Sequence, residues 1–134
     1  MKKLTVKAQI DNIADVMDFV NAELEKHNFP ENAQNDLNLV VDEIFANIAH
    51  YAYDDGDGIA EVFICVGEKT LLRFVDSGKP YNPLEKEEPD LDIPLEEREI
   101  GGLGIHFVKN VVDKIEYEYK DGKNILTVTK EIGL

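Results

Sequence analysis

A run of apolar residues at helical spacing constrains the fold of this chain most. It begins at Leu37 and falls on one stripe of a helix that starts near Glu31. A helix of this length with one apolar face must pack on something flat, which favours a helix lying on a sheet. The stripe consists of Leu37, Val40, Val41, Ile44, Ile48, Tyr51 and Ala52, and the "DDGDG" at 54–58 ends the helix.

The remaining segments supply the strands and two further helices. Asp11 or Asn12 can cap a helix that closes at His27, and helical spacing resumes after "GGLG" at 101–104. The predicted order is β, α, α, β, β, loop, α, β, β. This order predicts an α/β (α+β) two-layer sandwich, with the helices on one face of a mixed, mostly antiparallel sheet. The expected strands are 3–10, 59–66, 70–76, 114–120 and 125–132.

Length and charge restrict the class of protein. The chain has 134 residues, so we expect a single domain over 1–134. There are 14 Lys and Arg against 28 Asp and Glu, a net charge of -14, which disfavours direct binding to nucleic acid or to an anionic membrane. Cys65 is the only cysteine, and the start "MKKLTVKAQID" lacks the apolar core of a signal peptide. We therefore expect a cytoplasmic protein.

Residues 77–100 differ in composition from the rest of the chain. They hold four of the five prolines and many acids, without a sustained helical or strand period. A loop this long inside a small domain is usually functional or disordered. We expect a mobile lid over about 77–100.

Two polar side chains interrupt the apolar stripe one turn apart. At about 100° per residue, Glu43, Asn47 and His50 share one edge of the helix, at the border of the core. Glu43 and Asn47 lie about 6 Å apart along the axis. A carboxylate there can take a proton, and an amide oxygen can bind a hard cation such as magnesium. The spacing equally suits boundary residues that pair with each other, so partners elsewhere must decide.

Two glycine motifs supply such partners. "DSGKP" begins at Asp76, where a strand ends: Gly78 lets the backbone turn, and the carboxylate can accept a hydrogen bond from an exocyclic amine. "GGLGIHFV" runs from Gly101 into a helix start, whose free N–H groups and positive dipole end attract an anion. Taken singly, the first is a turn and the second a hinge with a helix cap.

The combination resembles the GHKL ATPase superfamily. An E-x-x-x-N helix is followed by a D-x-G-x-P strand end, a proline-bearing lid and a G-x-G helix start. "VDSGKPYNPLE" and "GGLGIHFVKN" are most similar to the stand-alone anti-sigma-factor serine/threonine kinases of bacterial partner switching, more than to histidine kinases. The resemblance covers nearly the whole chain and implies a histidine-kinase-like ATPase fold that binds ATP and Mg²⁺.

The resemblance also implies roles for single residues. Glu43 would be the general base, Asn47 the magnesium ligand and Asp76 the adenine reader, with Gly78 lining the base pocket. The phosphates would lie at Gly101, Gly102, Leu103 and Gly104.

The chain departs from the family pattern in two places. Relatives often carry a histidine four residues after the magnesium asparagine; Tyr51 stands there and His50 sits one residue earlier, so no histidine role carries over. A late threonine commonly helps to bind adenine, whereas the corresponding turn reads "DGKN". Asn124 is the substitute we favour for cofactor binding, and Thr127 is a second candidate.

The phosphates of ATP need compensating charge in so acidic a chain. Arg98, three residues before the glycines, is our candidate for a phosphate contact. A salt bridge from Arg98 to a neighbouring glutamate is an equally good interpretation.

The resemblance implies partners as well. The γ-phosphoryl group would pass to a serine or threonine of an anti-sigma-factor antagonist, a small protein binding beside the lid, and a sigma factor is a further candidate partner. Kinship also implies a homodimer. One alternative is a nucleotide-gated binding module with little or no kinase activity, and a weaker one is a detached histidine-kinase ATPase domain. Retained Glu43 favours the kinase, because a module that only binds needs no base.

Other motifs fail on spacing. "DGDG" lacks the register of a calcium-binding EF-hand, and Phe107 stands where "GGLGIH" would need the third glycine of a dinucleotide-binding fingerprint. We expect Phe45, Phe74, Phe107 and Tyr117 to be core residues without a ligand role.

Overall fold

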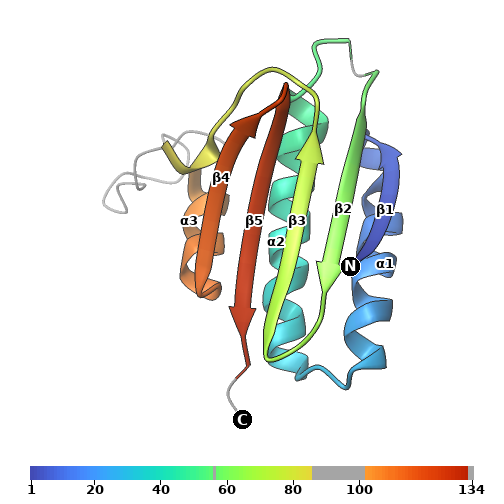
Figure 1. Cartoon of the computed structure of the whole chain (residues 1–134), viewed down its shortest axis with the longest axis vertical. Helices are drawn as coiled ribbons and strands as arrows, with labels where there is room; N and C mark the ends of the chain where they lie inside the picture. Colours follow the sequence, from blue (N-terminus) through green and yellow to red (C-terminus); the bar gives the residue numbers. More distant parts are fainter. Residues whose placement is uncertain (56, 86–101, 133–134) are drawn as a thin grey trace.

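The computed structural model of the chain describes residues 1–55, 57–85 and 102–132. In this part of the chain three helices cover one face of a five-stranded sheet (Figure 1). The helices are α1 (Ile13–Lys26), α2 (Glu31–Tyr51) and α3 (Gly102–Val111). The strands are β1 (Lys2–Lys7), β2 (Ile59–Cys65), β3 (Lys69–Asp76), β4 (Lys114–Lys120) and β5 (Lys123–Glu131).

The sheet has the strand order β1-β2-β3-β5-β4. The predicted two-layer fold class is confirmed. The expected mixed character is not seen, because every neighbouring pair of the described strands is antiparallel. A two-residue turn joins β4 to β5, with Asp121 at φ 54° and Gly122 at φ 77°, the backbone that an Asp-Gly hairpin turn requires. In the β3–β5 register, Asp76 lies directly opposite Asn124.

The core lies between the sheet and the helices, and α2 contributes most to it. Its predicted apolar stripe is buried from Leu37 to Ile48, and α3 adds Ile105 and Val108. Phe45 and Phe74 are almost completely buried, which confirms them as core residues. Phe107 was expected in the core but is 48% exposed. It lies about 200° around the helix from Ile105, so it points away from the sheet.

The first elements start and stop slightly differently from the prediction. β1 ends at Lys7, and Ile10 opens a short 3₁₀ turn (Ile10–Asn12) in which its side chain is exposed. Asn12 directly precedes α1, but its side-chain amide donates to the carbonyl of Lys7 at 3.0 Å and does not cap the helix. The amide therefore ties the helix start back to the end of the first strand.

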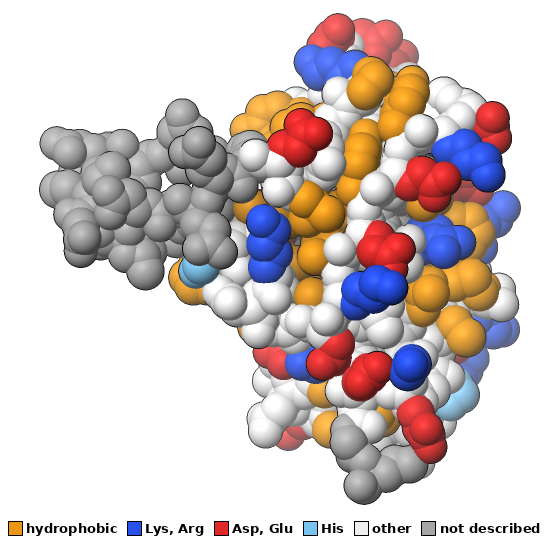
Figure 2. Space-filling model, turned by 60° about the vertical axis from the view of Figure 1, so that its left-hand side comes forward, with side chains coloured by type: hydrophobic (Ala, Val, Ile, Leu, Met, Phe, Trp, Pro, Cys, Tyr) orange, Lys and Arg blue, Asp and Glu red, His pale blue; other side chains and the backbone are white. Residues whose placement is uncertain are grey.

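The face of the sheet opposite the helices carries side chains of mixed type. In Figure 2, Lys and Arg side chains stand among Asp, Glu and apolar side chains, and no large patch of one sign appears on the visible face. None of the described helices is both long enough and apolar enough to cross a bilayer.

Candidate functional site

The acid and the amide of α2 meet the start of α3. Asn47 donates through Nδ2 to Glu43 Oε1 at 3.5 Å, as their one-turn spacing predicts. Both carboxylate oxygens of Glu43 lie against Gly104, because a Cβ added to that glycine would fall well inside 3.0 Å of each of them. Only a glycine at 104 lets the two helices bring the carboxylate this close to the first turn of α3.

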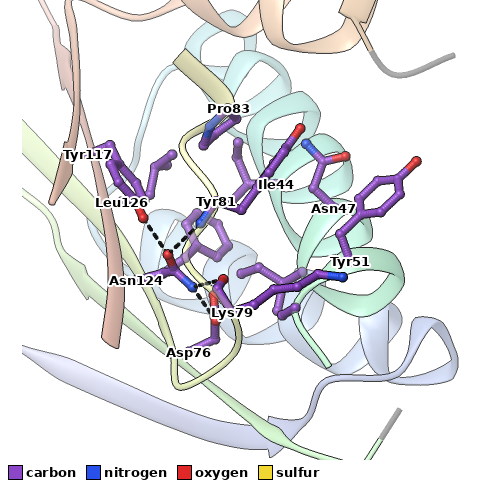
Figure 3. Close-up of a pocket in the computed structure, with 13 residues that line it drawn as sticks. Ile44, Asn47, Tyr51, Asp76, Lys79, Tyr81, Pro83, Tyr117, Asn124 and Leu126 are labelled. Atoms are coloured by element: carbon purple, nitrogen blue, oxygen red, sulfur yellow. Dashed lines mark hydrogen bonds between the residues drawn. The ribbon is translucent and has the colours of Figure 1, made fainter. Parts of the chain in front are cut away.

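A pocket runs along α2 from Asn47 towards the end of the helix (Figure 3). Its apolar walls come from α2, β3, β5 and the segment after β3, and its polar end holds Asp76 and Asn124. Asn47 lines this pocket and contacts Glu43, which in turn lies against Gly104 at the start of α3. The lining residues are Ile44, Asn47, Ile48, Tyr51, Ala52, Phe74, Asp76, Lys79, Tyr81, Pro83, Tyr117, Asn124 and Leu126.

Asp76 is the buried acid of the pocket. Its residue is only 6% exposed, and burial raises the pKa of the carboxyl group, against the opposing effect of two hydrogen bonds. These bonds come from Asn124 Nδ2 and from the N–H of Gly78, each at 2.9 Å, and both go to Oδ1. Within the described residues, Oδ2 receives no such bond, so it is the oxygen that can accept from a ligand in the pocket.

The chain leaving β3 is held firmly against the end of α2. A Cβ on Gly78 would overlap the carbonyl of Ala52, and the next residue donates to that carbonyl, from Lys79 N at 3.0 Å. Tyr53 also links this segment to the start of β2, because its hydroxyl donates to Ile59 O at 2.6 Å and accepts from Ser77 N at 2.8 Å. Gly78 thus shapes the polar end of the pocket through backbone contact.

Asn124 lies at the pocket and Thr127 does not. Asn124 is 6% exposed and bonded to Asp76, whereas Thr127 Oγ1 accepts from Arg73 Nε at 3.0 Å in a hollow on the uncovered face of the sheet. Side chains on a strand alternate between faces, so residues 124 and 127 point in opposite directions. The structure therefore excludes Thr127 from this pocket.

Three tyrosines line the pocket without having been predicted there. Tyr51 and Tyr81 lie with ring centroids 6.0 Å apart, and Tyr117 donates its hydroxyl hydrogen to Asn124 Oδ1 (Figure 3). Tyr117 was wrongly expected to be a core residue without a site role. Tyr51 stands one turn after Asn47, a spacing that could have identified it, whereas Tyr81 follows no periodic pattern. His50 is exposed and packs its ring edge-on against Tyr51.

The predicted phosphate end is only partly within the described residues. Gly102, Leu103 and Gly104 form the first turn of α3. Arg98, Gly101 and most of the lid predicted over 77–100 lie outside the described residues. The described start of that segment holds a short 3₁₀ turn at Pro83–Glu85, and Tyr81 N donates to Asn124 Oδ1 at 3.1 Å.

The geometry suits a magnesium-bound nucleotide. Asn47 is oriented with Nδ2 towards Glu43, and among the described residues its amide oxygen has no hydrogen-bond donor. Magnesium commonly takes one or two protein oxygens and completes its shell with phosphates and water, so one amide oxygen at the pocket fits that need. The described residues contain no group of three or more His, Cys, Asp and Glu side chains placed to hold a metal.

Comparison with protein families agrees with this arrangement. The model of the histidine kinase-like ATPase domain matches residues 6–130 of the chain. The chain belongs to this family. The match includes α2 with Glu43 and Asn47, the end of β3 with Asp76, and the start of α3, so the family covers every element that builds the pocket.

Several relatives of the chain are named as protein kinases or as anti-sigma factors. A serine/threonine-protein kinase BtrW of Bordetella bronchiseptica is 28% identical over 96 residues, covering 69% of the chain and 67% of the relative. An anti-sigma F factor of Thermoanaerobacter is 29% identical over 100 residues, covering 73% of the chain and 70% of the relative. A serine-protein kinase RsbW of Halalkalibacterium halodurans is 23% identical over 132 residues, covering 96% of the chain and 81% of the relative.

A solved structure shows the same fold. The crystal structure of the RsbU and RsbW domains of Rv1364c from Mycobacterium tuberculosis superposes with a TM-score of 0.63 at 12% identity. The match covers 98% of the chain but 32% of that longer polypeptide. The predicted histidine-kinase-like ATPase fold is thereby confirmed.

Proposed function

We propose that this chain is an ATP-dependent serine/threonine protein kinase of the anti-sigma-factor type, acting in the cytoplasm. The observation that carries the proposal is the convergence of Glu43 with the glycine start of α3, beside a pocket whose far end holds a buried acid. The family membership and the kinase names of relatives at 23–28% identity support it.

The nucleotide lies with its base near Asp76 and its phosphates towards the first turn of α3. The exocyclic amine of adenine donates a hydrogen bond to Asp76 Oδ2. The N–H groups at Gly102–Gly104 and the positive end of the helix dipole face the phosphates. Asn47 would hold magnesium, which would supply positive charge beside the phosphate oxygens.

Glu43 acts on the acceptor hydroxyl. The hydroxyl oxygen of a serine or threonine forms a bond to the γ-phosphorus while the bond from that phosphorus to the bridging oxygen of ADP breaks. The hydroxyl proton passes to Glu43, and ADP leaves with the bridging oxygen. Positioning and electrostatics supply most of the acceleration in such transfers, and the base adds roughly 100- to 10,000-fold.

The acceptor in this proposal is a small anti-sigma-factor antagonist that binds beside the lid, and a sigma factor is the regulated partner. The protein works as a homodimer. Two relatives named anti-sigma F factor support a role in which the chain also binds a sigma factor directly. The second candidate function is a nucleotide-gated binding module. It is supported by the same two anti-sigma F factor names and needs no phosphoryl transfer.

The experiment is a transfer assay. The purified chain is incubated with magnesium and γ-labelled ATP, with and without small antagonist proteins from the same genome, and label on protein is measured. Glu43→Gln should lower transfer by about 100-fold or more while ATP still binds. Asp42→Asn is the matched control, because Asp42 is exposed on the neighbouring position of α2 and should retain full transfer. Unchanged transfer by Glu43→Gln would refute the base assignment, and ATP binding without any transfer would favour the binding module.

A further inference from the structure

Asn124 occupies the centre of the polar end of the pocket. It is the cross-strand partner of Asp76 and points towards it (Figure 3). Both residues are 6% exposed. Its neighbours come from three places in the chain: the end of β3, the segment that follows it, and β4.

The amide of Asn124 is fully used by the protein. Nδ2 donates to Asp76 Oδ1 and to Lys79 O, each at 2.9 Å, with Gly78 O further away at 3.5 Å. Oδ1 accepts from Tyr81 N at 3.1 Å and from the hydroxyl of Tyr117. A carboxamide has two N–H donors and two acceptor lone pairs, so these four partners leave none for a ligand.

The same partners fix which way the amide points. A backbone carbonyl can only accept and a backbone N–H can only donate, so the nitrogen must face Lys79 O and the oxygen must face Tyr81 N. If the amide were flipped, its oxygen would face the carbonyl oxygen of Lys79 and Oδ1 of Asp76, and neither of these can donate a hydrogen bond. Asn124 therefore always presents an N–H to Asp76.

We propose that Asn124 is a positioning residue that sets the base preference of the pocket through Asp76, without touching the base itself. The inference rests on the proposed binding of an adenine nucleotide. Because Asn124 and Gly78 both bond Oδ1, the carboxylate plane is fixed and Oδ2 is presented as an acceptor. An acceptor favours the 6-amino group of adenine and repels the 6-carbonyl oxygen of guanine.

The bond also opposes protonation of the carboxylate. Burial raises the pKa of Asp76, and the hydrogen bond from Asn124 is the larger of the two hydrogen bonds that oppose this rise. Loss of that bond should move the pKa further up, so that the carboxyl group is protonated, and stops being a pure acceptor, at a higher pH.

A matched pair of variants tests the inference. Threonine and valine have nearly the same shape and both suit a strand, but only threonine can donate to Asp76. Asn124→Val should weaken ATP binding by about 10-fold or more and reduce the preference for ATP over GTP by a similar factor. Asn124→Thr should keep a clear preference for ATP. Thr127→Val is the control on the same strand, because Thr127 lies on the uncovered face of the sheet, and it should keep the preference as well.

The measurements are the dissociation constants of ATP and GTP over a range of pH, with thermal melts to check folding. In Asn124→Val, the loss of ATP binding on acidification should begin at a higher pH than in the wild type. Equal losses for ATP and GTP in the Val variant, or equal behaviour of Val and Thr, would overturn the inference and leave the proposed function intact. If the wild type binds no nucleotide, the proposed function fails and the inference with it. If the Val variant does not fold, loss of the ATP preference in Asn124→Thr, which keeps a donor for Asp76, would equally refute the role assigned to Asn124.

Discussion

Among single residues, Gly104 is the position where the absence of a side chain matters most for the candidate site. A Cβ there would meet the two carboxylate oxygens of Glu43, which are the far end of a flexible side chain. Gly104→Ala should therefore displace the carboxylate and lower phosphoryl transfer by about 10-fold or more, with a change in unfolding free energy below about 1 kcal/mol. Transfer rates and thermal melts of the variant check this, and full transfer by Gly104→Ala would contradict the close packing of the base on α3.

The buried carboxyl group of Asp76 should make the stability of the protein depend on pH. Its carboxyl pKa is raised in the folded chain by burial, so folding favours the protonated form. This contribution is fully present below the unfolded pKa of about 3.9 and is lost as the pH rises through the higher folded value. Asp76→Asn keeps an oxygen for both bonds to Oδ1 and has no charge to bury. Relative to wild type, the variant should gain stability as the pH rises from about 4.

Denaturant unfolding of both proteins at several pH values measures this difference. The same variant points an amide nitrogen into the pocket, so its ATP affinity should fall by about 10-fold or more. A stability difference that stays constant across the pH range would contradict the burial of an ionisable carboxyl at this position.

Among the elements, the joint between α2 and the end of β3 determines the shape of the pocket. Gly78→Ala places a Cβ against the carbonyl of Ala52, which is backbone and cannot move aside. The variant should lose about 1–3 kcal/mol of unfolding free energy and bind ATP more weakly. Gly67→Ala is the matched control, since a Cβ there comes no closer than 4.0 Å to another group. Equal stability of the two variants would show that the joint is not tightly packed.

The elements also show what the sequence can predict. Period and alternation located the three helices and the five strands to within a few residues, because each has one face in the same core. Asn124 and Thr127 were both candidates for nucleotide binding. Only the register of β5 against β3 shows that Asn124 lies on the face of the sheet that holds the pocket and Thr127 on the uncovered face. Tyr81 was missed because its position depends on a backbone bond to Asn124, and no local pattern encodes that bond.

Some contacts at the candidate site were predictable for a different reason. The one-turn spacing predicted the contact between Glu43 and Asn47, and the structure shows that contact and places Asn47 and Asp76 in the lining of the same pocket, while the roles of these residues stay predictions. The internal use of the Asn124 amide was not predictable, because it depends on four partners from separate segments. Phe107 was placed wrongly since a short helix of mostly apolar residues gives little contrast between its faces.

For the molecule as a whole, we propose that magnesium-ATP binds in the pocket between α2 and the end of β3, with its phosphates extending to the start of α3. Titration of the chain with ATP in a calorimeter, with and without magnesium, tests this most directly. We expect saturable binding with one nucleotide per chain, stronger with magnesium, weakened by Asp76→Asn and weaker for GTP. Absence of any binding heat, or binding that Asp76→Asn leaves unchanged, would contradict it.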